Sequence, residues 1–185
     1  MTAAARAAYP RNREIKWRGR IVIGGGVLLA LVHAALLHHL KLEDFTPDLY
    51  TVAALFLGLF ASRHGRYGPS LVFGLIRDFF SLGLLGSYAV LYSLLHKAAG
   101  RAREKFDPER VGNVFIMAVI GTFLVNFGYH VMLALAGDGV GWSRALARCA
   151  GTAVATGPLA VLLFPIWHWL LGKCGAKRSG PFWNI

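Results

Sequence analysis

The stretch FGLIRDFFSLGLLG, Phe73 to Gly86, places two opposite charges and a glycine-rich turn inside an apolar run. Arg77 and Asp78 stand side by side in it, and Gly83 and Gly86 follow near its end. Neighbouring residues of a helix point about 100° apart, so these two side chains cannot pair face to face. We therefore expect each charge to find a separate partner.

The composition of the whole chain indicates an integral membrane protein. Hydrophobic residues make up 56% of the 185 residues and charged residues only 16%, whereas soluble domains carry about 25% charged residues. The excess of 20 basic over 9 acidic side chains would suggest nucleic acid in a soluble protein. Here the basic residues lie between apolar segments, so they indicate membrane topology and no nucleic-acid partner.

Four segments are apolar enough to cross a bilayer, which takes roughly 20 residues of helix. They are Ile21 to Leu40, Asp48 to Ser62, Val111 to Ala136 and Ser143 to Leu171. The second is short unless its helix opens at Thr46-Pro47, where Thr46 is the expected N-cap and Pro47 a first-turn residue.

The segment from Pro69 to Ala99 forms either one long helix or two short ones broken at Gly83 to Gly86, and the charges favour two. With six crossings, 16 of the 20 Lys and Arg residues lie on one side, which the positive-inside rule assigns to the cytoplasm. We expect an all-α, multi-pass protein with both termini cytoplasmic. Residues 21–172 form its six-helix membrane domain, between a basic tail at 1–20 and a C-terminal tail at 173–185.

Asp78 is the polar residue that most needs an explanation. A carboxylate near the bilayer centre costs about 3 kcal/mol on insertion scales, so such a residue usually has a function and a buried partner. We expect His33, Thr122 or a helix of a partner protein in that role. The alternative is that Asp78 caps the broken helix or faces water at the turn. Arg77 is expected to reach the outer surface by extending its long side chain.

Two further patterns concern helix packing. Thr122, Asn126 and His130 recur every four residues and form a polar stripe, which we interpret as hydrogen bonding between helices, with a transport pathway as the alternative.

Ala147, Gly151 and Ala155 form a seam of small residues that lets another backbone approach closely. The helix that packs against this seam lies either within the chain or in another subunit, and the second case would give a homodimer.

The sequence holds no pattern typical of an enzyme or a cofactor site. It has no H-E-x-x-H, nucleophile elbow, Walker A or dinucleotide motif, and its His and Cys residues form no cluster with metal-ligand spacing. We expect no enzymatic activity, metal or cofactor. Cys149 and Cys174 are interpreted as free thiols.

From Ile21 to Leu171 the chain resembles the rod-shape-determining MreD family of bacteria. The similarity lies in TPDLYTVAALFLGLF and in YGPSLVFGLIRDFFSLGLLGSYAVLYSLL. Pro47-Asp48 match the Pro-Asp that opens the second helix of that family, and Gly74 with Asp78 match its G-x-x-x-D pattern. Arg77 departs from the apolar residue usual before that Asp.

The resemblance implies a role in cell elongation in the bacterial inner membrane. It implies MreC as partner, with RodA and a class B penicillin-binding protein reached through the complex and MreB indirectly, and a fold similar to the substrate-binding subunits of energy-coupling-factor transporters. We expect a non-catalytic scaffold that packs its helices against MreC, with an outer contact near Asp48, and that also contacts membrane lipids. The alternative is a small-molecule or lipid binder whose pocket is lined by Asp78, His33, Asn126 and His130.

Overall fold

The computed structural model describes Leu28 and residues 31–33, 46–60, 68–81, 84–107 and 110–173. These residues are helical apart from the turns that join the helices, and no strand occurs among them. Most of the expected first span, both tails and Cys174 lie outside the described residues. The assignment of the tails and the side of the membrane on which they lie therefore stay predictions.

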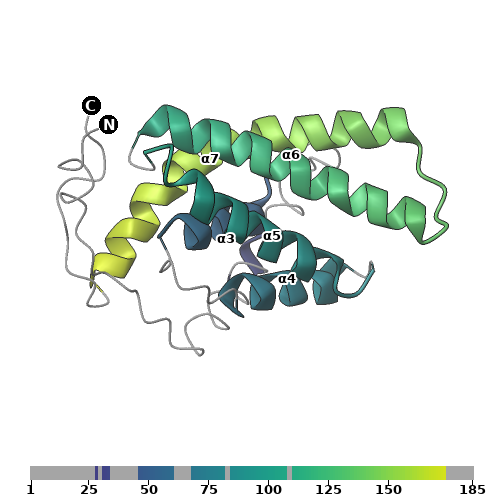
Figure 1. The fold of residues 1–185 in the computed structure, drawn as a ribbon, viewed down its shortest axis with the longest axis horizontal. Helices are drawn as coiled ribbons and strands as arrows, with labels where there is room; N and C mark the ends of the chain where they lie inside the picture. Colours follow the sequence, from purple (N-terminus) through teal and green to yellow (C-terminus); the bar gives the residue numbers. More distant parts are fainter. Residues whose placement is uncertain are drawn as a thin grey trace.

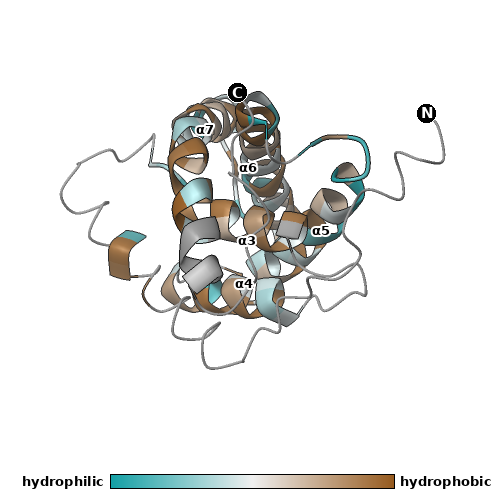
Figure 2. Cartoon of the chain, turned by 90° about the vertical axis from the view of Figure 1, so that its left-hand side faces the viewer, coloured by the Kyte–Doolittle hydropathy of each residue, from teal (hydrophilic) through white to brown (hydrophobic). Residues whose placement is uncertain are grey.

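Helix α3, Leu49–Phe60, is the central helix of the bundle. Its sequence LYTVAALFLGLF is apolar on every side, which is typical of a helix surrounded by others. Every residue from Leu49 to Leu59 is buried, and α3 contacts all four of the following helices. Figure 2 shows it enclosed, with α4 on one side and the α6 and α7 pair on the other.

Helices α4, Gly68–Ser81, and α5, Ser87–Ala102, confirm the predicted break. The chain turns back between them, and Gly86 has a φ of 93°, in the left-handed region that glycine adopts without strain. The two helices pack against each other along their length. The glycine-rich turn thus produces a helical hairpin in place of one long helix.

Helices α6, Val111–Leu135, and α7, Trp142–Lys173, confirm the last two predicted segments. Within the described residues they are the two helices long and apolar enough to cross a bilayer. The 12 residues of α3 and the 16 of α5 rise roughly 18 and 24 Å, less than the ~30 Å of a hydrocarbon core. The structure therefore supports an α-helical membrane protein but leaves six crossings a prediction.

Helix α6 packs beside α7, and α5 contacts both α3 and α6, whereas α4 lies on the side of α3 away from the α6 and α7 pair (Figures 1 and 2). Pro158 and Pro165 lie inside α7, and the C-terminal part of this helix runs in a different direction from its beginning (Figure 1). Prolines bend helices because each removes an intrahelical hydrogen bond.

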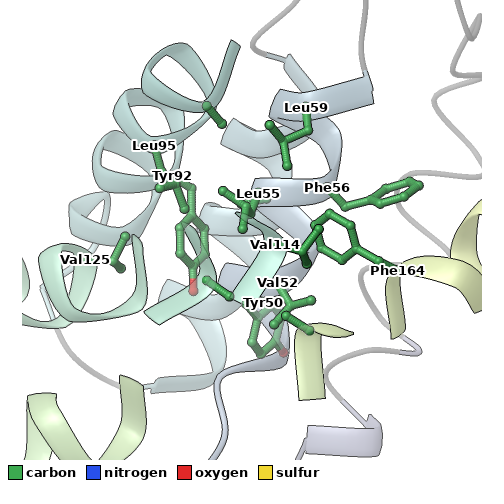
Figure 3. Close-up of a cluster of buried hydrophobic side chains, with 14 of the residues drawn as sticks. Tyr50, Val52, Leu55, Phe56, Leu59, Tyr92, Leu95, Val114, Val125 and Phe164 are labelled. Carbon is green, nitrogen blue, oxygen red and sulfur yellow. The ribbon is translucent and has the colours of Figure 1, made fainter. Parts of the chain in front are cut away.

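The core lies around α3 and joins it to α5, α6 and α7 (Figure 3). Leu55 and Leu59 of α3 belong to one buried cluster with Tyr92 of α5. The ring of Phe56 meets the ring of Phe164 edge to face at 5.2 Å, which fixes α3 against α7. These contacts hold the polar residues described below in a rigid frame.

Gly74 marks the closest approach of α4 to α5. A Cβ atom at this position would lie 2.6 Å from the carbonyl oxygen of Tyr88 and closer still to the backbone of Ala89. Only a residue without a side chain lets the two backbones meet here. By contrast, a Cβ added at Gly68, in the first turn of the same helix, would have no heavy atom within 4 Å.

We predict that Gly74→Ala lowers stability by about 1–3 kcal/mol, because α4 must move away from α5 to admit a methyl group. Gly68→Ala is the matched control and should leave stability unchanged or slightly higher, since alanine favours helix. The midpoint of thermal denaturation, followed by size-exclusion chromatography in detergent, measures both. Equal midpoints for the two variants would contradict the close packing of α4 on α5.

Candidate functional site

Asp48 begins α3 and is its N-cap. One carboxylate oxygen accepts a hydrogen bond from the backbone N–H of Thr51 at 3.0 Å, and the other accepts one from the Thr51 hydroxyl at 2.7 Å. The expected cap at Thr46 is therefore wrong, because the helix begins at Leu49 and its first free N–H groups face Asp48. Pro47 directly precedes this cap and is half-buried.

Asp48 also ties α3 to α7. Its backbone N–H donates to the hydroxyl of Thr156 at 2.8 Å, and that hydroxyl donates in turn to the carbonyl of Thr152 at 2.6 Å. The Asp48 side chain is only 1% exposed. A carboxylate so deeply buried needs a cation beside it.

Arg77 of α4 supplies that cation. Its Nη1 atom forms an ion pair with Asp48 and also donates to the hydroxyl of Tyr92. The expectation that Arg77 extends to the outer surface is wrong: its side chain is 14% exposed and turned inward toward α3. The inward position is stabilised by the ion pair, because opposite charges attract each other more strongly inside the protein than in water.

Tyrosine rings surround the Arg77 guanidinium. Its Cζ atom lies 3.9 Å from the centre of the Tyr88 ring and 5.7 Å from those of Tyr50 and Tyr92. The electron-rich faces of these rings attract a cation and partly replace the lost water. We call Asp48, Arg77, Tyr50, Tyr88 and Tyr92 the buried ion-pair cluster.

His33 lies beside this cluster and not beside Asp78. Its ring meets that of Tyr50 edge to face at 5.5 Å. Its buried Nδ1 atom has no hydrogen-bond partner within the part of the chain that the structure describes. The expected pairing of His33 with Asp78 is therefore not what the structure contains.

Asp78 caps α5, as the alternative interpretation had it. Its two carboxylate oxygens accept hydrogen bonds from the backbone N–H groups of Gly86, Tyr88 and Ala89, at 3.0 to 3.2 Å, and from the hydroxyl of Ser87 at 3.1 Å. These N–H groups would otherwise be unsatisfied at the start of the helix. The negative charge also lies at the positive end of the α5 dipole. Asp78 thus holds the hairpin closed from the preceding helix.

Among the described residues, the polar stripe of α6 makes none of the expected hydrogen bonds between helices. Asn126 donates to the carbonyl of Thr122 in its own helix at 2.9 Å. The Thr122 hydroxyl is buried and has no hydrogen-bond partner among the described residues. Asn126 and His130, half-buried, line a polar recess of about 200 Å³. Neither His33 nor Asp78 lines this recess.

The seam of small residues on α7 does not belong to the most buried side of this helix. The buried side of this helix is formed by other residues, namely Ala145, Cys149, Ala153, Thr156, Ala160 and Phe164. Ala147 is exposed, and Gly151 and Ala155 are half-buried. The use of the seam by a partner helix stays a prediction.

The pairing of Asp48 with Arg77 was missed from the sequence, although a signal for it exists. Both residues are charged, both lie in or next to apolar segments, and opposite charges in such segments usually pair. Asp48 opens one expected span and Arg77 lies near the opposite end of the next, so an antiparallel arrangement brings them to the same level. A second missed pair joins Ser70 and His96, whose side chains lie 2.8 Å apart in the buried part of α4 and α5.

A comparison with family models finds one match, and it covers most of the chain. Residues 16–172 match the model of the rod shape-determining protein MreD. No curated protein and no solved structure gives a match. The matched range includes the buried ion-pair cluster, the hairpin and the polar recess.

We predict that Asp48 and Arg77 depend on each other energetically. Asp48→Asn keeps a good N-cap residue but leaves Arg77 without its counter-charge, and Arg77→Gln leaves Asp48 buried and alone. Each single change should lower stability by about 3–5 kcal/mol. The double variant should cost less than the sum, with a coupling energy of about 0.5–3 kcal/mol.

Thermal denaturation of the purified protein in detergent measures this cycle. Arg144→Gln serves as control, because Arg144 is exposed near the start of α7 and should change stability little. Strictly additive effects of the two changes would show that the ion pair does not hold the helices together.

For Asp78 we predict a graded effect confined to the start of α5. Asp78→Ala removes all four hydrogen bonds and should cost about 1–2 kcal/mol, and Asp78→Asn, which keeps one carbonyl oxygen as acceptor, should cost less. Hydrogen exchange of the amides of residues 86–89 should speed up in that order, while the amides of α6 stay protected. Unchanged exchange at residues 86–89 in Asp78→Ala would contradict the capping role.

Proposed function

Because the chain belongs to the rod shape-determining protein MreD family, we propose that it acts as a non-catalytic membrane scaffold of the bacterial elongation complex. Membership indicates a role in determining rod shape, within the shape complex that MreB, MreC and MreD form. We further propose that the chain is a multi-pass protein of the inner membrane and that it binds MreC through its helix faces. RodA and a class B penicillin-binding protein are then reached through the complex.

The observation that carries this proposal is the internal use of the charged residues in the helix bundle. Asp48 and Arg77 join α3 to α4, and Asp78 closes the hairpin of α4 and α5. No group of three or more His, Cys, Asp or Glu side chains in the described part of the chain could hold a metal ion. What the bundle offers to a partner is the outer surface of rigid helices.

Large apolar side chains cover that outer surface. Phe79 is 74% exposed and Phe80 57%, and further exposed apolar residues lie on the other helices: Leu85, Val90, Leu94, Ile116, Ile120, Leu124, Val154 and Leu162. Such a surface is stable against lipid and against apolar helices of a partner. Because lipid and partner side chains are equally apolar, close packing decides which helices associate.

We propose the seam of small residues on α7 as the face that receives the membrane span of MreC. Ala147, Gly151 and Ala155 let a second backbone come close, and none of the three is among the buried core residues of the described helices. The contact expected near Asp48 cannot involve its carboxylate, which is buried in the ion pair. A second copy of the chain is the competing occupant of the seam.

The test is co-purification of MreC with this protein from detergent-solubilised membranes. Ala147→Leu adds bulk to the exposed seam and should reduce recovered MreC by about tenfold, the effect of losing 1.4 kcal/mol of binding. Ala98→Leu is the matched control, an exposed alanine of α5 away from the seam, and should recover MreC as the parent does. Failure of the parent to retain MreC refutes the scaffold, and equal recovery with Ala147→Leu refutes the seam.

Binding of a whole vitamin is the weaker alternative for this chain. The polar recess holds about 200 Å³, whereas sites for drug-sized molecules typically hold 300–1,000 Å³. Two of the four residues expected to line a pocket, Asp78 and His33, are placed elsewhere. The recess nevertheless has a composition of its own, from which a narrower inference follows.

A further inference from the structure

The polar recess lies between α5, α6 and α7, beside the buried ion-pair cluster. Its lining residues are Thr46, Tyr88, Asn126, Tyr129, His130, Arg148, Cys149 and Thr152. Tyr88 belongs to both places: one of its neighbours is the Arg77 guanidinium, and its ring also stacks on Tyr129 at 4.6 Å. Polar side chains gathered between membrane helices are costly and usually have a function.

The lining contains hydrogen-bond donors and no carboxylate. Arg148 and His130 are its basic groups, and Asn126, Thr152 and Tyr129 add an amide and two hydroxyls. Two carboxylates of the neighbouring helices are already engaged, since Asp48 pairs with Arg77 and Asp78 caps α5. Arg148 takes part in another interaction of the chain, and its guanidinium carries five N–H donors in all. Such a set of donors suits an oxyanion.

The recess lies toward one end of the α6 and α7 pair. His130 lies five residues before the end of α6 and Arg148 six residues after the start of α7. At 1.5 Å per residue both lie roughly 8–9 Å from the end of the helix pair. A helix of 25 residues is roughly 37 Å long and extends beyond a ~30 Å hydrocarbon core at its ends. The recess thus lies roughly 5 Å inside the edge of the hydrocarbon core and nearer to that edge than to the bilayer centre.

From these observations we propose that the polar recess binds a phosphate-type oxyanion, with Arg148 and His130 as its principal ligands. The oxyanion is either the phosphate of a phospholipid headgroup or free inorganic phosphate. A volume of about 200 Å³ accommodates a phosphate group with a few waters, each of which occupies about 30 Å³. This site is separate from the seam of small residues on α7 and does not depend on binding to MreC.

The experiment is a calorimetric titration of the full-length protein, purified in detergent and stripped of lipid. One arm uses sodium phosphate and the other dihexanoylphosphatidylglycerol below its micellar concentration. The variants are Arg148→Gln and His130→Gln, and the matched control is Arg144→Gln, another exposed arginine of α7, which does not line the recess. Circular dichroism and elution volume confirm that each variant is folded.

We expect the dissociation constant of the parent to rise about tenfold in Arg148→Gln, because a charge-assisted hydrogen bond is lost, and to rise less in His130→Gln. Arg144→Gln should bind as the parent does. Binding of the lipid alone assigns the site to a headgroup, and binding of both probes with equal affinity assigns it to phosphate itself. Equal weakening by Arg148→Gln and Arg144→Gln, or no binding of either probe by the parent, overturns the proposal.

Discussion

The structure depends on the neutralisation of one buried carboxylate. Asp48 is almost fully enclosed at the start of the central helix, where an isolated charge would be unstable. Arg77 neutralises it from α4, and Tyr92 of α5 and Thr156 of α7 complete the hydrogen bonds. Asp48 and Arg77, with their hydrogen-bond partners, therefore join α3, α4, α5 and α7 to one another. Removing one charge leaves the other buried and unpaired. This lowers the stability of the fold more than replacing both residues with apolar ones would.

Around this pair the molecule separates polar contacts from apolar surface. The charged side chains inside the bundle serve its own geometry, whereas the outward faces of α4, α5, α6 and α7 carry large apolar residues (Figure 2). A protein built in this way presents stable helix faces to its neighbours, which suits a scaffold. The polar recess differs from the rest because its donors have no matching carboxylate in the lining.

Local signals in the sequence were sufficient to predict the helices but not their contacts. The distribution of basic residues along the chain predicted the break at Gly83 to Gly86 that the structure has, and apolar length predicted α6 and α7 nearly to their ends. The start of α3 could not be fixed from the sequence in the same way, because Thr46 and Asp48 are both good N-cap residues. Only the packing of α3 selects Asp48.

The partners of the charged residues could not be derived from the sequence in the same way. Arg77 was expected to reach solvent, since a long side chain near a helix end has that option. The choice between solvent and Asp48 depends on how α3 and α4 lie against each other, which no local pattern encodes. For Asp78 the sequence left a few candidate partners and a capping role as the alternative. The structure has the capping role, because the turn at Gly86 brings the start of α5 back to the Asp78 carboxylate.

The unequal lengths of adjacent helices have a consequence for the surrounding lipid. α5 rises roughly 24 Å between its turns, whereas α6, packed beside it, rises roughly 37 Å. Acyl chains that touch Val90 and Leu94 of α5 meet a shorter hydrophobic wall than those that touch α6. In a chain that crosses with both helices, as the sequence predicts, the bilayer must become thinner on that flank or α6 must tilt, and either response costs a fraction of a kcal/mol per Å of mismatch. The protein is thereby favoured where the membrane is already thin or deformed.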